Sequence, residues 1–156
     1  MTEVIHGVSY SLESLSPELL TEVEPLLAMH SKEVSHYPDI PLDPDYEGYY
    51  QIQDRGGLRV FVARDERKVL IGYSVFFIRR GMHYRSSLQA YQDILFIHPE
   101  RRGFGMRFID WCDGVLRTEG VQVVYQHLKF AADFSKMLER LDYEKIDMIM
   151  GRRLDR

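Results

Sequence analysis

The sequence predicts a mixed α/β (α+β) domain built around one central twisted sheet, and three observations predict it. A proline-led helical segment follows a short β-leaning start, three segments rich in β-branched and aromatic residues then come in succession, and two helix–strand pairs close the chain. The chain has 156 residues, of which 45% are hydrophobic, so it can bury the core of one such domain. We therefore expect a single domain spanning residues 1–156.

The first half of the chain contains a strand signal followed by two helix signals. Residues 4–12 favour a short strand. Ser16 and Pro17 provide an N-cap and a first-turn proline, so a helix should run from Pro17 to about Val34. The stretch "SHYPDIPLDPDYEGYY" is rich in proline, aspartate and tyrosine, which predicts a loop. Within it, Asp43 and the proline that follows predict the start of a second helix that ends near "DRGG".

The second half of the chain contains most of the strand signals. The segments "LRVFVAR" and "VLIGYSVFFIRR", joined by the turn "DERK", predict a β-hairpin because β-branched and aromatic residues favour strands. A further strand should cover residues 88–97. The next helix should begin at the glycines that follow and end at Gly120, because the apolar residues between them lie at helical spacing. The remaining expectations are a strand over 121–129, a short helix over 132–142 and a closing strand over 143–154.

Composition and charge limit the class of protein. The formal net charge is −4. A general nucleic-acid binder carries a basic excess that neutralises phosphates, so the charge argues against that class of protein. Cys112 is the only cysteine, so no internal disulfide can form, and the first residues lack the basic and apolar regions of a secretion signal. No stretch approaches the roughly 20 apolar residues of a membrane span. We expect a cytoplasmic protein that makes no use of a membrane.

The stretch "HPERRGFGMRF", residues 98–108, lies where a strand should pass into a helix. A turn can use the glycines, but it does not need two arginines. The first amides of a helix and the positive end of its dipole bind anions, and glycines let an anion approach the backbone. A tight surface turn with solvated arginines is the alternative interpretation. The predicted anion site consists of the Arg102 guanidinium and the amides of Gly103, Phe104, Gly105, Met106 and Arg107.

Two common phosphate motifs fit this stretch poorly. A Walker loop needs a lysine that is absent here, and a dinucleotide fingerprint needs a third glycine where Phe108 stands. The longer string "IHPERRGFGMRFI" instead resembles the acetyl-CoA-binding segment of the GNAT N-acetyltransferase superfamily. Arg107 replaces the final small residue of that segment's pattern. The residues that fall on the pattern are Pro99, Glu100, Arg102, Gly103 and Gly105.

The resemblance covers most of the chain in the order of its elements. It extends weakly to "FSKMLERLDYEKIDMIMGRRL", which is similar to the superfamily's final helix and strand. The string "MHYRSSLQAYQDILFIHPE" also resembles the small acetyltransferases of phages and prophages. The resemblance implies a GNAT-like fold, in which a sheet of about six to seven strands is flanked by about four helices.

The resemblance also implies a function, that of an acetyl-CoA-dependent N-acetyltransferase. A primary amine would attack the acetyl thioester directly in a ternary complex, with acetyl-CoA as the acyl donor and no metal; a homodimer is compatible with this family. The strand residues Leu95, Phe96 and Ile97 would lie beside the pantetheine, and residues 102–107 would hold the pyrophosphate. The acceptor would enter from the side of the first two helices and their connecting loop.

Catalysis would need a base, because an alkyl ammonium must lose a proton before it attacks a thioester. Strict alternation places Tyr91, Asp93, Leu95 and Ile97 on one face of their strand. Asp93 is the first candidate for the base, since a carboxylate among apolar strand residues needs a reason, and Tyr91 shares its predicted face. His127, on the next predicted strand, is the second candidate for proton transfer. A structural hydrogen bond for Asp93 and a satisfied, partly buried His127 are the alternatives.

The catalytic acid has no clear candidate. In the family it is often a tyrosine on the helix before the last strand, and Leu138 stands at that position here. Tyr143 fits the core better than the site, and Tyr125 is a distant alternative. The missing tyrosine favours a hypothesis of another class, a catalytically quiet CoA-binding or regulatory module. A third hypothesis is a local nucleic-acid contact through Arg79, Arg80 and Arg85.

Two further groups carry less weight in the sequence. The spacing of His30, Glu33 and His36 does not place a compact set of ligands on one helix face, so no metal site is predicted. Cys112 lies among apolar positions of a predicted helix, which favours a buried structural thiol over a nucleophile.

Overall fold

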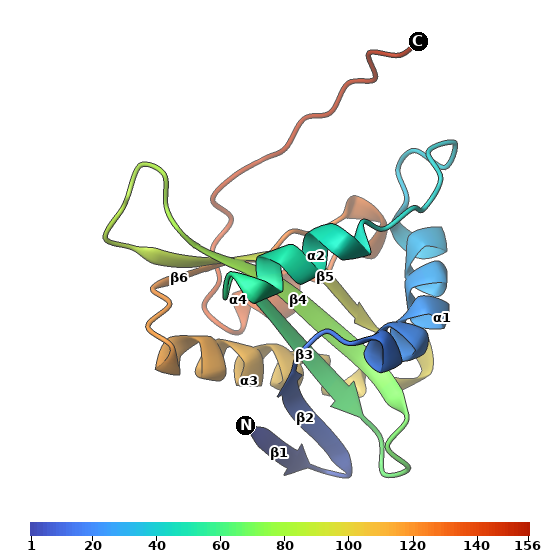
Figure 1. The fold of residues 1–156 in the computed structure, drawn as a ribbon, viewed down its shortest axis with the longest axis vertical. Helices are drawn as coiled ribbons and strands as arrows, with labels where there is room; N and C mark the ends of the chain where they lie inside the picture. Colours follow the sequence, from blue (N-terminus) through green and yellow to red (C-terminus); the bar gives the residue numbers. More distant parts are fainter.

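One six-stranded sheet runs through the molecule, with its strands side by side in chain order (Figure 1). The computed structural model describes all 156 residues. Neighbouring strands are antiparallel except for β5 and β6, which are parallel. The strands are β1 (Thr2–Ile5), β2 (Val8–Glu13), β3 (Leu58–Arg64), β4 (Leu70–Arg80), β5 (Leu88–Ile97) and β6 (Val123–Tyr125). The helices are α1 (Pro17–Val34), α2 (Tyr46–Asp54), α3 (Gly105–Thr118) and α4 (Ser135–Glu139).

Helices cover both faces of the sheet, and each face has its own apolar core. On one face α3 packs its buried residues, including Phe108 and Leu116, against Phe61 and Phe76 of the sheet. On the other face α1 and α2 contribute a second cluster, in which Leu19 and Leu26 pack with Tyr73 and Phe96. A mixed sheet between two helical layers is the predicted fold class, with six strands and four helices.

Side-chain caps determine where the first two helices begin. The Ser16 hydroxyl accepts a hydrogen bond from the amide of Leu19 at 3.2 Å, and α1 has the predicted bounds. The Asp45 carboxylate accepts a bond from the amide of Gly48 at 2.9 Å. The second helix therefore begins after Asp45, slightly later than the predicted start at Asp43.

The predicted first strand, residues 4–12, is wrong as a single element. The chain folds back on itself there, and Ile5 pairs with Val8 across a two-residue turn. Both turn residues, His6 and Gly7, have positive φ, of 49° and 79°. A tight turn of this kind matches the twist of the two flanking strands, so β1 and β2 form a hairpin.

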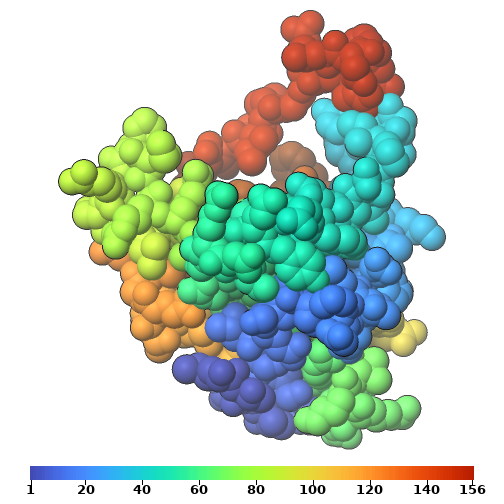
Figure 2. Space-filling model, in the orientation of Figure 1, coloured from blue at the N-terminus to red at the C-terminus, as the bar shows by residue number.

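The end of the chain also differs from its prediction. The strand expected over 121–129 is confined to β6, and the helix expected over 132–142 is confined to α4. The closing strand expected over 143–154 does not form. That tail pairs with no strand of the sheet, and near its end the Arg153 guanidinium binds the Asp39 carboxylate at 2.9 Å in the loop after α1 (Figure 1, Figure 2). Alternating apolar residues predict a strand, but a strand exists only where it pairs with another.

Candidate active site

A β-bulge in β5 determines where the predicted base lies. On β4, Val75 pairs with Ile94, but the next residue, Phe76, pairs with Gln92. Asp93 is therefore an extra residue with no partner opposite it. A bulge of this kind bends the strand and changes the direction of a side chain, and it is common next to active sites.

The bulge breaks the alternation that the sequence suggests. Leu95 and Ile97 pack with the α3 cluster, whereas Ile94 packs with the cluster under α1 and α2. Asp93 lines a cavity on the α1 and α2 face together with Ile94. The prediction that Asp93 shares a face with Leu95 and Ile97 is therefore wrong, because the extra residue shifts the alternation by one position.

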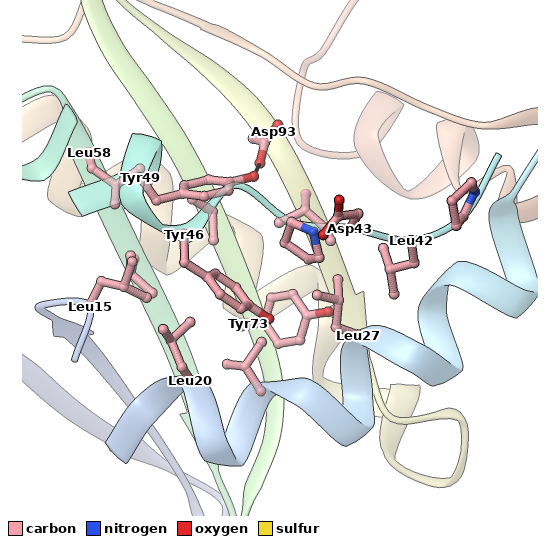
Figure 3. A pocket seen from close by; sticks show the side chains of 16 residues that line it. Leu15, Leu20, Leu27, Leu42, Asp43, Tyr46, Tyr49, Leu58, Tyr73 and Asp93 are labelled. Carbon is pink, nitrogen blue, oxygen red and sulfur yellow. Dashed lines mark hydrogen bonds between the residues drawn. The ribbon is translucent and has the colours of Figure 1, made fainter. Parts of the chain in front are cut away.

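The cavity beside Asp93 lies between α1, α2 and the sheet, and it is also bordered by the loop that joins the two helices (Figure 3). Its volume is about 330 Å³. This is the side from which the resemblance implies entry of the acceptor. The lining residues are Leu15, Leu20, Val23, Leu27, Pro41, Leu42, Asp43, Pro44, Tyr46, Tyr49, Leu58, Val60, Tyr73, Val75, Asp93 and Ile94.

Asp93 has one side-chain partner, the hydroxyl of Tyr49 on α2, which donates a hydrogen bond to its carboxylate (Figure 3). Burial raises the pKa of Tyr49, and the Asp93 charge raises it further. Tyr49 therefore keeps its proton at neutral pH, and its hydrogen bond holds the exposed Asp93 carboxylate in place.

The hydroxyl of Tyr73 has no partner in the protein. Tyr73 is only 1% exposed, lines the same cavity, and its hydroxyl finds neither a backbone nor a side-chain group to bond. Figure 3 shows it near Leu20 and Leu27 of α1, apart from the pair formed by Tyr49 and Asp93. Nearly all buried polar groups in proteins are hydrogen-bonded, so this one calls for an explanation.

The neighbouring strands β5 and β6 separate halfway along β5. Only residues 89–91 pair with β6, and β6 ends at Tyr125, while β5 continues to Ile97. The edge of β5 beyond Tyr91 therefore has no strand partner on that side. This is the strand segment that the resemblance places beside pantetheine, including Leu95, Phe96 and Ile97, and because their side chains are in the core, contact would be through the backbone.

The glycine–arginine turn forms a short 3₁₀ segment, Pro99–Phe104, that leads directly into α3. Gly103 has a negative φ, and a Cβ atom there would meet nothing within 4 Å, so neither conformation nor packing requires glycine. Gly105 differs, because its Cβ would come within 3.0 Å of the Ile97 side chain. Phe104 provides no capping side chain for α3. The amide of Gly105 donates to the carbonyl of Arg102, so this member of the predicted set of anion-binding amides is already hydrogen-bonded within the turn.

Arg102 has a partner in the free protein. Its guanidinium binds the Glu33 carboxylate on α1 at 2.6 Å, and its Nε donates to the carbonyl of Ile97 at 3.3 Å. His30, one turn before Glu33, packs its ring against Phe96 at 5.1 Å. Burial lowers the pKa of His30, Glu33 opposes this effect, and the positive charges of Arg102 and Lys129 reinforce it. Arg102 and Lys129 thus both act on His30, and Arg102 also lies in the turn where the phosphates are expected.

The other two residues of the predicted anion site face outward. Met106 is 38% exposed and Arg107 is exposed. Burial raises the pKa of the Tyr10 hydroxyl on β2, and the Arg107 charge partly opposes this effect. Its role toward a phosphate stays a prediction.

The remaining predicted site residues lie away from the cavity. Tyr91 stacks on Tyr125 at 4.8 Å, with the Arg79 guanidinium 4.5 Å above its ring. The backbone amide of His127 donates to the side chain of Gln92 at 2.6 Å, while its own side chain is exposed. Neither Tyr91 nor His127 lines the cavity that contains Asp93.

Tyr143, near the end of the chain, contacts α3 and does not line the cavity. The Tyr143 hydroxyl donates to the carboxylate of Asp113 on α3 at 2.8 Å. Burial raises the pKa of Asp113 to about 6, and the Tyr143 hydrogen bond works against this rise. Leu138 is 3% exposed and Cys112 is 1% exposed, so both belong to the core, as predicted for Cys112.

Other features of the structure concern a metal site, a membrane span and a nucleic-acid contact. No group of three or more His, Cys, Asp or Glu side chains lies close enough together to hold a metal ion. None of the helices combines the length and the apolar character that crossing a membrane requires. Of the three arginines considered for nucleic acid, Arg79 covers Tyr91, and Arg80 bonds the carbonyl groups of Arg85 and Ser86 within its own hairpin.

Sequence reasoning missed the tyrosines that complete the site. Tyr46 and Tyr49 lie three residues apart on α2, so both reach the cavity from one face of the helix. That spacing is visible in the sequence and could have identified them. Tyr73 could not be found in this way, because it lies in an apolar strand among other aromatic residues, and only the structure shows that its hydroxyl is unpaired.

No protein-family model matches the chain, and no curated protein matches it. Solved structures do match its fold over nearly the whole length. Glucosamine-6-phosphate N-acetyltransferase from Arabidopsis thaliana has a TM-score of 0.69 at 10% sequence identity, covering 94% of this chain and 99% of that chain. Ribosomal-protein-alanine N-acetyltransferase from Brucella melitensis biovar Abortus 2308 has a TM-score of 0.69 at 18% identity, covering 95% and 99%.

An aminoglycoside acetyltransferase from an uncultured soil metagenomic sample has a TM-score of 0.67 at 18% identity, and the match covers 94% of this chain and 97% of that chain. All three structures belong to the GNAT acetyltransferases. The fold of this protein is therefore the GNAT fold, which confirms the predicted fold class.

Proposed function

We propose that this protein is an N-acetyltransferase that transfers an acetyl group from acetyl-CoA to a primary amine. One observation carries the proposal: the β5 bulge directs Asp93 into a cavity, in the same strand whose edge is left free by β6. The cavity and the free edge lie at one strand, so an acceptor amine and an acetyl donor would meet there. The phage-type likeness and a cytoplasmic location stay predictions.

The residues around the free strand edge fit acetyl-CoA. Residues 92–97 of β5 offer a strand edge to the amide groups of pantetheine, and the open space at Gly103 lets a pyrophosphate approach the start of α3. Arg102 supplies a charge for that pyrophosphate. When bound, acetyl-CoA supplies an acetyl group already activated as a thioester.

Asp93 would act as the base in this reaction. An acceptor ammonium has a pKa near ~10, so it is protonated at neutral pH and must lose a proton first. The Asp93 carboxylate, held by Tyr49, accepts that proton directly or through a water molecule. The amine nitrogen then attacks the acetyl carbonyl, a C–N bond forms and the C–S bond breaks. The second proton that the nitrogen loses passes to the sulfur, so CoA leaves as its thiol and the product is the amide.

Acetyl-CoA binding tests the cofactor half of the proposal. In calorimetric titrations we expect the wild-type protein to bind acetyl-CoA and Arg102→Ala to bind it at least about tenfold more weakly, because charge-assisted hydrogen bonds to a phosphate are lost. Arg101→Ala is the matched control, since Arg101 is the neighbouring exposed arginine with only a distant ion pair to Asp65, at 3.9 Å. Its affinity should stay within about twofold of wild type.

Turnover tests the catalytic half. Transfer of labelled acetyl groups to a panel of amines should be detectable with wild-type protein, and Asp93→Asn should reduce kcat by about 10²–10⁴. Absence of acetyl-CoA binding, or unchanged binding by Arg102→Ala, overturns the proposal. Tight acetyl-CoA binding without acetylation of any amine would instead support the quiet CoA-binding module, which the buried Leu138 at the usual tyrosine position favours.

A further inference from the structure

The cavity beside Asp93 has a mostly apolar lining that contains acidic side chains and no basic ones. Apart from two aspartates, every lining side chain is aliphatic, proline or tyrosine. No lysine, arginine or histidine lines it. Its volume of about 330 Å³ lies at the lower end of the range for small-molecule sites, about 300–1,000 Å³. The cavity therefore suits a small and largely apolar molecule.

The charge of the cavity is negative. Asp43 borders it from the loop between α1 and α2, and Asp93 from the bulge of β5. Neither carboxylate forms a salt bridge, and the only side-chain partner of Asp93 is the neutral hydroxyl of Tyr49. Two unneutralised carboxylates attract a cation, and with no basic residue present they repel phosphate and carboxylate groups.

Tyr73 adds a specific polar contact to this apolar space. Tyr73 lines the cavity, its side chain is almost wholly buried, and the protein offers its hydroxyl no partner. It lies among the leucines of α1, apart from Asp93 (Figure 3). A group that is buried and unpaired in the free protein can gain a full hydrogen bond from a bound molecule.

We propose that the acceptor is a small primary amine on an apolar body that carries one hydrogen-bonding group, in the manner of a hydroxylated arylalkylamine. The ammonium binds at Asp93 beside Tyr49, the body packs against Leu20 and Leu27, and the polar group meets the Tyr73 hydroxyl. This inference rests on the proposed acetyltransferase function and assigns the substrate class of the same site. Amino-sugar phosphates, aminoglycosides and peptide N-termini are the classes that it excludes.

A panel of acceptors tests the class. With acetyl-CoA as donor, we expect kcat/KM to be at least about tenfold higher for tyramine and 2-phenylethylamine than for glucosamine 6-phosphate, sisomicin or a peptide with N-terminal alanine. We also expect tyramine to exceed 2-phenylethylamine by about three- to tenfold, since its ring hydroxyl can bond Tyr73. In Tyr73→Phe this preference should disappear, with the change mainly in KM.

A pair of charge variants tests the electrostatic part without disturbing the core. Leu42 lines the cavity from the loop and is 51% exposed, so a charged side chain can replace it without unfolding the protein. Leu42→Lys and Leu42→Glu both remove the leucine side chain, and they differ chiefly in the sign of the charge that they add. The KM for 2-phenylethylamine should be at least about fivefold higher in the lysine variant, and the ratio should shrink in high salt.

Binding of tyramine in the absence of donor separates this inference from the proposed function. If tyramine binds calorimetrically but is not acetylated, the class of ligand assigned to the cavity stands and the enzymatic proposal fails. If the protein acetylates the sugar phosphate, sisomicin or the peptide in preference to both arylalkylamines, the enzymatic proposal stands and the substrate class is wrong. If wild type and Tyr73→Phe both act on tyramine and 2-phenylethylamine with equal kcat/KM, the role assigned to Tyr73 is wrong.

Discussion

Tyr73 and Tyr143 place the same side chain in opposite environments. The Tyr73 hydroxyl is buried without a partner, whereas the Tyr143 hydroxyl donates to the Asp113 carboxylate at 2.8 Å. Removing an unpaired buried hydroxyl costs no hydrogen bond, so Tyr73→Phe should leave the free energy of unfolding unchanged or raise it by about 1 kcal/mol. Tyr143→Phe should lower it by about 1–3 kcal/mol, because a charged acceptor loses its donor.

Urea unfolding of both variants measures this contrast, and each serves as the control for the other. The result that would contradict it is a clear loss of stability in Tyr73→Phe. Such a loss would mean that the hydroxyl has a partner in the free protein, and it would remove one support from the assignment of the acceptor class.

Asp113 makes the stability of the protein depend on pH. Its pKa is raised to about 6, against an ordinary value of 3.8, mainly by burial. Between these two values the folded state holds a proton that the unfolded chain has lost. Stability therefore falls as pH rises from about 4 to about 6, by up to about 2–3 kcal/mol, and stays lower above that window.

Asp113→Asn should remove this dependence, since asparagine stays neutral and can still accept the Tyr143 hydrogen bond. We expect the variant to be more stable than wild type at pH 7.5 and equally stable near pH 4, with the difference developing between those values. Urea unfolding at several pH values follows it. A constant difference across the whole range would show that Asp113 is not the group responsible.

Single residues differ in how far the sequence reveals them. Asp93 was predicted because a carboxylate in an apolar strand is conspicuous, and the structure brings it to a cavity. Tyr91 and His127 were selected by residue type and position, and the structure places both outside that cavity. Tyr49 and Asp93 are 44 positions apart in the sequence, and only the fold brings them into contact. No local sequence pattern predicts such a pair.

At the scale of elements, local signals predicted what local interactions decide. The bounds of α1 follow from the Ser16 cap and from Pro17, and those of β3 and β5 follow from runs of β-branched and aromatic residues between turns. The bulge in β5 depends on how β4 pairs with it, so strict alternation wrongly put Asp93 on the face of Leu95 and Ile97. Register between strands is a property of two segments, and one segment alone does not reveal it.

The contact between α1 and the glycine–arginine turn leads to a prediction about affinity. In the free protein Arg102 binds Glu33 at 2.6 Å, so a pyrophosphate must compete with that carboxylate for the guanidinium. Glu33→Gln removes the competing charge. Its affinity for acetyl-CoA should rise by about two- to fivefold, because a partly exposed ion pair contributes up to about 1 kcal/mol.

The matched control is Glu24→Gln, which removes the same charge from an exposed position on the same helix that forms no salt bridge. Calorimetric titration with acetyl-CoA at low and moderate salt should show a gain for Glu33→Gln alone, and the gain should diminish as salt rises. A loss of affinity in Glu33→Gln would instead mean that Glu33 positions Arg102 for the phosphate.

At the scale of the whole molecule, the sheet has two outer edges, β1 and β6, and no further strand pairs with either of them. β6 is the last strand, it is three residues long, and no segment pairs with its outer side. The tail that the sequence predicted as a closing strand carries a row of exposed apolar side chains: Ile146, Met148, Ile149, Met150 and Leu154. The physical reason for the wrong prediction is that an apolar pattern marks a surface that needs a partner, but it does not identify the partner.

An exposed sheet edge beside an exposed apolar segment favours association with a second copy of the chain. We expect the mass measured by sedimentation equilibrium to rise from monomer toward dimer with protein concentration, and Ile149→Lys to shift the protein toward monomer. Ile149 is 79% exposed, so the substitution should not affect the fold. Ser86→Lys adds the same charge to an exposed hairpin loop and should associate like wild type. A protein that stays monomeric at every concentration, or an Ile149→Lys variant that associates as strongly as wild type, would show that the tail is not an interface between copies.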